Sequence, residues 1–107
     1  VLENSKSLLI GGSLQEENVA HLANKEFIVV QEMFETATTE FADVVLPAAS
    51  FVEVDGTYTN NTGFVQRVRQ SIEPLHQSKP DWVITSLIAR EMGADFGYNF
   101  AATMVFK

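Results

Sequence analysis

The stretch ADVVLPAASFVEVDGTYTNNTGFVQRVR, residues 42–69, joins a short apolar run to a polar segment that is rich in turn formers. Residues 44–46 are too continuously apolar for a strand that faces water, and Pro47, which cannot extend a central ladder, stops the run. In residues 50–69, aromatic and Thr residues alternate with Gly, Asn and Asp, which is typical of a β-hairpin. The stretch therefore predicts a buried strand followed by a hairpin excursion.

The residues before this stretch predict further strands and short helices. Residues 7–10 and 27–30 are apolar runs that indicate strands, and residues 36–42 are a short helical candidate. Ser13 and Glu16 have the spacing of a capping box, which predicts a helix that ends near Asn24. Continuous apolar strands separated by helices are typical of parallel sheets. We expect a three-layer, Rossmann-like α/β domain with a mainly parallel sheet plus a β-hairpin excursion.

The last third of the chain predicts one more helix. Residues 78–81 have a capping-box pattern with Pro80 in the first turn, and an apolar stripe follows and ends at Gly93. Residues 94–107 have the character of a truncated or loosely held tail. We expect one α/β domain over residues 1–107, excised from a longer protein.

Composition excludes several classes of function. A net charge of −7 over 107 residues argues against nucleic-acid binding and against an anionic membrane surface. No apolar run approaches the ~20 residues that span a bilayer, so direct membrane insertion is not expected. The chain has no Cys and therefore no disulfide, thiolate metal site or Cys nucleophile. Neither His21 nor His76 has metal-ligand spacing, and no catalytic residue or metal ligand is predicted.

A ligand of a parallel sheet binds at the carboxyl ends of the strands. After the first predicted strand, Gly12 and Ser13 either admit a phosphate at the helix start or form a tight turn. After the second, Glu32 follows Gln31 and is either a reader of a guanine edge or ribose diol, or a solvated charge. The residues that follow Pro47 complete this edge, and both alternatives stay open on spacing alone.

The predicted hairpin carries more hydrogen-bonding groups than a simple turn requires. Arg67 and Arg69 are two residues apart on the predicted strand, so they would share a side and could meet phosphate or carboxylate. Alternatively, both are solvated charges that pair with Glu53 or Asp55. The other polar residues of the hairpin are Thr57, Thr59, Asn60 and Asn61.

Six motifs in sequence order carry a resemblance to a known family: FIVVQEMF (27–34), TAT (36–38), ADVVLP (42–47), EVDGTYTN (53–60), GFVQR (63–67) and PDW (80–82). Together they resemble the molybdopterin oxidoreductase family. Within it the sequence is similar first to the large iron-sulfur subunit of NADH-quinone oxidoreductase (respiratory complex I) and next to formate dehydrogenase alpha subunits.

The resemblance implies a fragment of an electron-transfer enzyme that binds molybdopterin guanine dinucleotide. The segment that matches residues 53–67 lies near the pterin and its phosphates in that family, and the strand ends lie at the nucleotide. The metal ligand and the iron-sulfur cysteines come from regions outside these residues, so the fragment alone is expected to be inactive. The expected cofactor-binding residues are Gly12, Ser13, Gln31, Glu32, Thr36, Asp55, Gly56, Thr57, Asn60, Gln66 and Arg67.

Two departures from the family pattern support an alternative. Phe64 stands where members commonly have Arg, and the loop between Gly12 and Phe27 is shorter than is usual in the family. Glu32 stands where members commonly have Asp, which is a mild change. The alternatives are a cofactor-free scaffold domain of the large complex I subunit, or a formate dehydrogenase alpha-subunit fragment; a free-standing nucleotide-binding regulator is a third class. The resemblance implies as partners the remaining domains of the parent subunit and other subunits of a respiratory or formate dehydrogenase complex. It also implies a cytoplasmic location, at the cytoplasmic face of the inner membrane through partner subunits.

Overall fold

The chain, described over residues 1–98 in a computed structural model, divides into two units, Val1–Ala48 and Ala49–Lys107. Whether they act as the single domain expected for residues 1–107 stays a prediction. Residues 94–98 of the predicted tail form neither helix nor strand, and its remainder, 99–107, lies outside the described residues.

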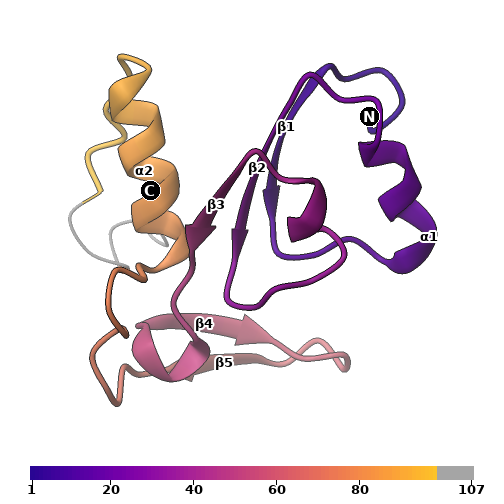
Figure 1. Ribbon diagram of the computed structural model, residues 1–107. Coiled ribbons are helices and arrows are strands. Elements are labelled where there is room, and N and C mark those ends of the chain that lie inside the picture. The colour runs from indigo at the N-terminus through magenta and orange to yellow at the C-terminus, as the bar shows by residue number, and fades with distance from the viewer. Residues whose placement is uncertain (99–107) are drawn as a thin grey trace. The chain divides into compact units, whose positions relative to one another are not determined.

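A parallel sheet is the centre of the first unit (Figure 1). Its strands are β1 (Ser7–Gly11), β2 (Phe27–Glu32) and β3 (Val44–Pro47), with β2 in the middle. The register pairs Ile10 with Val30 and Val30 with Val45. Each apolar run that predicted a strand forms one, so the parallel sheet is confirmed.

Helical residues cover one face of this sheet. α1 (Glu16–Val19) continues into a 3-10 turn at Ala20–Leu22, and a second 3-10 turn, Thr39–Phe41, lies in the segment that was predicted to be helical. The core cluster joins the helical side chains Val19 and Leu22 to the β2 side chains Ile28 and Val30. Burial of each large aliphatic side chain contributes about 1.5–3 kcal/mol, so this cluster holds the unit together.

The other face of the sheet remains partly exposed. Leu9, Val29 and Val44 are register partners and therefore share a face, on which Leu9 is 51% and Val44 39% exposed. α1 and the 3-10 turn that follows it pack on the opposite face. A mixed α/β class with parallel and antiparallel strands is thus confirmed, whereas the three-layer, Rossmann-like arrangement is not.

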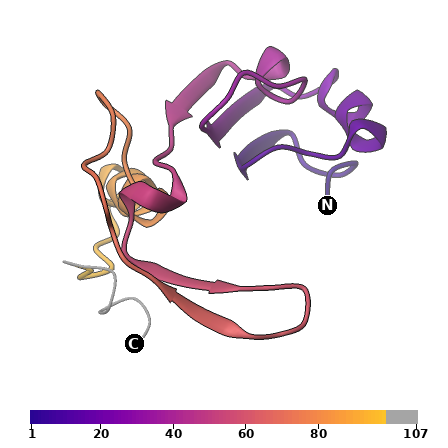
Figure 2. The ribbon, with the colours of Figure 1, turned by 90° about the horizontal axis from the view of Figure 1, so that it is seen from below.

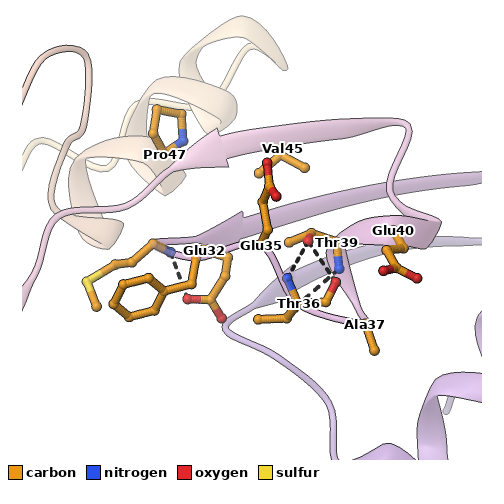
Figure 3. Close-up of a pocket in the computed structure, with 10 residues that line it drawn as sticks. Glu32, Glu35, Thr36, Ala37, Thr39, Glu40, Val45 and Pro47 are labelled. Atoms are coloured by element: carbon orange, nitrogen blue, oxygen red, sulfur yellow. Dashed lines mark hydrogen bonds between the residues drawn. The ribbon is translucent and has the colours of Figure 1, made fainter.

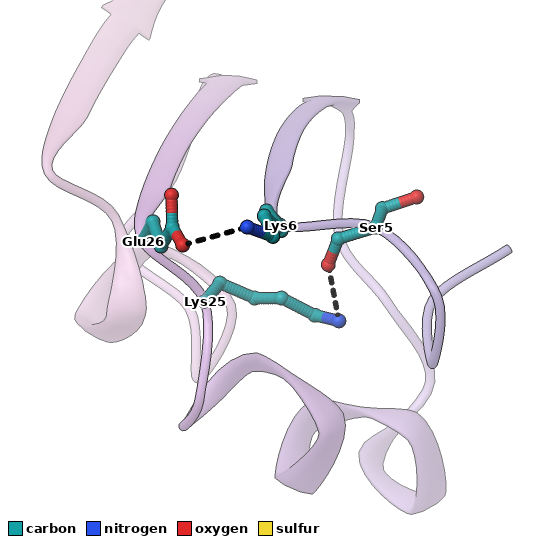
Figure 4. Close-up of polar contacts among 4 residues, drawn as sticks. All are labelled: Ser5, Lys6, Lys25 and Glu26. Carbon is teal, nitrogen blue, oxygen red and sulfur yellow. Dashed lines mark hydrogen bonds and ion pairs between the residues drawn. The ribbon is translucent and has the colours of Figure 1, made fainter.

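Polar contacts fix the amino ends of β1 and β2 (Figure 4). The Glu26 N–H donates to the Lys6 carbonyl at 2.8 Å, and the two side chains form an ion pair at 3.6 Å. Lys25 Nζ donates to the carbonyl of Ser5 at 2.7 Å and also to that of Leu2. These contacts lie at the amino ends of the strands, opposite the carboxyl ends at which a ligand was predicted. They help to fix the strand register and leave the carboxyl ends free.

The second unit contains a β-hairpin and a helix. β4 (Gly56–Thr59) and β5 (Val65–Val68) pair antiparallel, and Figure 2 shows the turn that joins them. A 3-10 turn, Phe51–Glu53, precedes β4, and α2 (Asp81–Glu91) follows the hairpin. The predicted hairpin and the predicted last helix are both confirmed. No helix within residues 1–98 has the length and apolar character needed to cross a membrane.

The two predicted capping boxes are wrong. α1 begins at Glu16 after Gln15, and the Ser13 hydroxyl bonds elsewhere. α2 begins after Pro80 without a side-chain cap, and the Ser78 hydroxyl donates to the carbonyl three residues before it. In both segments the serine hydroxyl donates to another group instead of accepting a helix N–H, and the helix begins later than the Ser spacing predicted.

Candidate functional site

The carboxyl ends of the three strands meet at one edge of the first unit. The Gly12 N–H donates to the Gln31 carbonyl at 2.8 Å, and the Ala48 N–H donates to the Glu32 carbonyl at 3.2 Å. Both bonds extend the ladders just past the strand ends. Gly12 has φ +85°, a conformation that glycine adopts without strain, so the tight-turn interpretation accounts for this residue.

A chain of hydroxyl groups joins the loops that leave β1 and β2. Ser13 Oγ donates to Glu32 Oε2 at 2.7 Å and lies 2.8 Å from Thr36 Oγ1. Because Ser13 has one O–H, and Glu32 takes it, Thr36 is the donor in the second bond. Thr36 Oγ1 in turn accepts the Thr39 N–H at 3.4 Å. Each bond polarises the next, so these hydroxyls fix the position of the Glu32 carboxylate.

The Glu32 carboxylate also accepts a hydrogen bond from the backbone of the next residue. Its Oε1 accepts the Met33 N–H at 2.7 Å, so each oxygen has one protein donor. An ionised carboxylate has about four acceptor positions. Glu32 can therefore accept two further hydrogen bonds from a ligand with neighbouring donors, without reorganising.

A second tie holds the two loops together beneath these hydroxyls. Thr38 is 1% exposed, and its Oγ1 accepts the Leu14 N–H at 2.9 Å. Thr38 was not among the predicted site residues, because its acceptor role depends on a partner 24 residues away. Gln31 is also buried, at 4% exposed, so it supports the edge from inside the sheet.

An open pocket of about 720 Å³ lies beside Glu32 and Thr36 (Figure 3). This volume is within the range of small-molecule sites. Three acidic residues line it, Glu32, Glu35 and Glu40, so it favours hydrogen-bond donors over phosphate. Sequence reasoning missed Glu35 and Glu40, which carry no motif. The remaining lining residues are Met33, Phe34, Thr36, Ala37, Thr39, Val45 and Pro47.

The start of α1 offers little to an anion. This helix has four residues and carries Glu16 and Glu17 in its first turn. Acidic side chains there already compensate the helix dipole and repel phosphate. The geometry does not support the phosphate interpretation of this turn.

The hairpin divides its predicted ligand-binding residues between two faces. Thr57 pairs with Arg67, while Gly56 pairs with Val68 and Tyr58 with Gln66. Because neighbours along a strand point to opposite faces, Thr57 and Arg67 share one face, and Gln66 lies on the other. A ligand bound on the face that carries Arg67 therefore cannot contact the Gln66 side chain from that face.

Two of the predicted hairpin residues have local structural roles. Asn60 Oδ1 accepts the N–H groups of Thr62 and Phe64, each at 3.0 Å, and so closes the turn. Asp55 Oδ1 accepts the Gln70 N–H at 3.3 Å at the base of the hairpin. Turn geometry thus explains both residues without a ligand.

The two arginines of the hairpin remain exposed. Within residues 1–98, neither Arg67 nor Arg69 forms an ion pair, so the predicted pairing with Glu53 or Asp55 is not seen. β5 ends at Val68, which leaves Arg69 beyond the strand. The prediction that Arg67 and Arg69 share a side required both to lie on one strand, and only Arg67 does.

Glu53 lies in a buried environment that the sequence analysis did not predict. It is 5% exposed, and its Oε2 accepts the Ser50 N–H at 2.6 Å in a capping box. This bond lowers the pKa of Glu53; burial acts in the opposite direction, and the Ser50 side chain and the Leu75 N–H lower the pKa further. The Ser-x-x-Glu spacing of residues 50–53 was the available signal.

The structure brings together one part of the predicted set. Gly12, Ser13, Gln31, Glu32 and Thr36 share the edge of the first unit, with Gln31 inside the sheet. The others, Asp55, Gly56, Thr57, Asn60, Gln66 and Arg67, belong to the second unit. A site common to both groups stays a prediction. No group of three or more His, Cys, Asp or Glu side chains in residues 1–98 is arranged to hold a metal ion.

The chain belongs to the molybdopterin oxidoreductase family, whose sequence profile matches residues 3–91. A protein named "Putative formate dehydrogenase" from Staphylococcus haemolyticus is 51% identical over 78 residues, which are 73% of this chain and 8% of that protein. A protein of the same name from Staphylococcus aureus (strain USA300) is 51% identical over 74 residues, 69% of this chain and 8% of that protein.

A solved structure has the same fold. Acetylene hydratase from Pelobacter acetylenicus superimposes with a TM-score of 0.66 at 26% identity, over 78% of this chain and 12% of that one. The chain thus spans about a tenth of these proteins. The expected likeness to the large subunit of NADH-quinone oxidoreductase gains no support from these relatives. They agree with the formate dehydrogenase alternative instead.

Proposed function

We propose that this chain is part of a formate dehydrogenase-type oxidoreductase and forms part of its binding region for molybdopterin guanine dinucleotide. Family membership and the names of the relatives support the enzyme class. The parent reaction would be the oxidation of formate to carbon dioxide, with release of one proton and two electrons. We further propose that the remaining domains of the parent and other subunits of its complex are the partners, in the cytoplasm.

The position of the Glu32 carboxylate is the observation that carries this proposal. Ser13 and Met33 hold it at the edge of the pocket, with acceptor capacity left on both oxygens. A guanosine presents neighbouring donors, either N–H groups of the base or hydroxyls of the ribose. The residues present therefore fit the nucleoside end of the cofactor, and the acidic pocket fits it better than it fits phosphate.

Residues of the hairpin would serve the anionic part of the same cofactor. Arg67 is exposed, shares a face with Thr57, and forms no ion pair within residues 1–98. A guanidinium and a hydroxyl on one face suit a phosphate oxygen. The bound cofactor supplies the redox chemistry, and this chain's side chains bind and orient it. Because the chain has no Cys, it provides no thiolate to an iron-sulfur cluster.

Replacement of Glu32 by Gln tests the proposal. The Glu32→Gln variant keeps the shape of the side chain but exchanges one acceptor oxygen for a donor. Hydrogen bonds to a charged group contribute about 1.5–3 kcal/mol, so cofactor affinity should fall about 10- to 100-fold. The measurement is the guanosine monophosphate released per protein by acid hydrolysis, after extended dialysis of the full-length protein from a host that makes the cofactor.

Glu17→Gln is the matched control, since Glu17 is an exposed residue of α1 outside the pocket. It should retain the cofactor as the wild type does. Equal retention in Glu32→Gln and Glu17→Gln would remove Glu32 from the site. Equal loss in both would show that overall charge, and not this pocket, governs retention.

A further inference from the structure

Both ends of the hairpin are bonded to each other through the segments that flank it. The segment before β4 carries the Val52 carbonyl, which accepts the Ser71 N–H at 2.8 Å. It also carries Asp55, whose Oδ1 accepts the Gln70 N–H at 3.3 Å. These donors follow directly on β5, which ends at Val68. The orientation of the hairpin relative to its own flanking segments thus depends on the hydrogen bonds that join these two segments.

Glu53 lies at the centre of this junction. Its Oε2 accepts the Ser50 N–H at 2.6 Å, three residues before it, and its Oε1 accepts the Leu75 N–H at 3.0 Å, 22 residues after it. One carboxylate therefore ties the turn before β4 to the loop after β5. Among the described residues it is also the buried ionisable side chain, at 5% exposed.

Both acceptor oxygens of Glu53 are needed for this tie. Each takes a backbone N–H from a different segment, and no ion pair to Glu53 occurs within residues 1–98. An amide in place of the carboxylate would satisfy one N–H and present its NH₂ group to the other, leaving two donors face to face. A buried donor without a partner is costly, so the junction would open.

We infer that Glu53 is a positioning residue, whose carboxylate fixes the two flanks of the β4–β5 hairpin and so sets the orientation in which Thr57 and Arg67 meet the cofactor. The inference rests on the proposed function for the cofactor contact. The junction itself rests on the bonds of Glu53 to Ser50 and Leu75.

The test compares Glu53→Gln with Glu73→Gln in the full-length protein. Glu73 is exposed and lies in the same flank, so its variant makes the same chemical change outside the junction. Amide hydrogen exchange of β4 and β5 is measured first. We expect exchange there to accelerate about tenfold in Glu53→Gln. Exchange in β2 of the first unit should stay at the wild-type rate in both variants.

The dissociation rate of the cofactor is the second measurement, and it separates positioning from a merely structural role. Faster exchange in the hairpin together with faster dissociation supports the inference. Unchanged exchange in the hairpin overturns it. Faster exchange with wild-type dissociation also overturns the positioning role and counts against a cofactor contact by the hairpin, while leaving the Glu32 pocket unaffected.

A shorter side chain provides a further check. Glu53→Asp lacks one methylene, so we expect it to keep the local bond to the Ser50 N–H and to lose the longer connection to Leu75. Hairpin exchange in Glu53→Asp should then resemble that of Glu53→Gln. Wild-type exchange in Glu53→Asp would show that the Leu75 bond does not hold the hairpin.

Discussion

The buried Thr38 hydroxyl is a single group whose removal should change the stability of the fold. Its Oγ1 accepts the Leu14 N–H at 2.9 Å, and the residue is 1% exposed. Thr38→Val keeps the shape and removes the acceptor, which leaves the Leu14 N–H without its partner. We expect a loss of about 1–3 kcal/mol in the free energy of unfolding, measured by urea denaturation.

Thr59→Val is the control for this substitution. Thr59 is an exposed β4 residue, and Val suits a strand, so the change should stay within about 0.5 kcal/mol. If both variants lost the same free energy, the cost would belong to the Thr-to-Val exchange in general, and the tie between the two loops would contribute nothing.

The behaviour of Ser13 marks a limit of sequence reasoning at this scale. Its position three residues before Glu16 fits a capping box, which is a local pattern. Its actual partners, Glu32 and Thr36, lie 19 and 23 residues away. Because the fold creates these contacts, no local spacing could indicate them. The apolar runs did locate the three strands and the edge at which Glu32 lies, although β2 continues past its apolar run through Gln31 to Glu32.

At the level of elements, long apolar runs were more informative than caps. β1, β2 and β3 lie where continuous apolar residues predicted strands, and the hairpin lies where turn formers alternate with Thr and aromatic residues. The three-residue turn Phe51–Glu53 was missed, because so short an element has no period. The division of Gln66 and Arg67 between hairpin faces was also missed, although it follows from the alternation of side chains along a strand.

The turn Phe51–Glu53 should make the stability of the chain depend on pH. Hydrogen bonding to Ser50 lowers the pKa of Glu53 below its ordinary value of 4.5. The folded state therefore favours the ionised carboxylate, and its contribution is complete above the pKa of the unfolded chain. This contribution is lost as the pH falls from 4.5 through the lower pKa of the folded state.

Urea unfolding of the wild type and Glu53→Gln at a series of pH values measures this contribution. The difference in free energy of unfolding between the two should be largest above pH 4.5 and should shrink as the pH falls further. The exposed Glu73→Gln variant should follow the wild type throughout. A difference that grew on acidification would mean that protonated Glu53 is the form that the fold prefers.

At the scale of the whole molecule, acidic charge exceeds what ion pairing can balance. The net charge is −7, and within residues 1–98 the ion pair is that of Lys6 with Glu26, whose side chains are 82% and 66% exposed. Such exposed pairs contribute about 0–1 kcal/mol. Repulsion among the carboxylates, including those of the three acidic residues that line the pocket, should therefore outweigh attraction at neutral pH.

Added NaCl should then stabilise the chain at pH 7. Salt shortens the range of charge interactions, from about 30 Å at 0.01 M to about 10 Å at 0.1 M, and so weakens a net repulsion. The thermal unfolding midpoint should rise over this range of salt. At a pH near 4.6, the isoelectric point of the sequence, the same addition should have almost no effect because the net charge is close to zero. A midpoint that fell with salt at pH 7 would show that attractive contacts, such as that of Lys6 with Glu26, dominate the electrostatics of the fold.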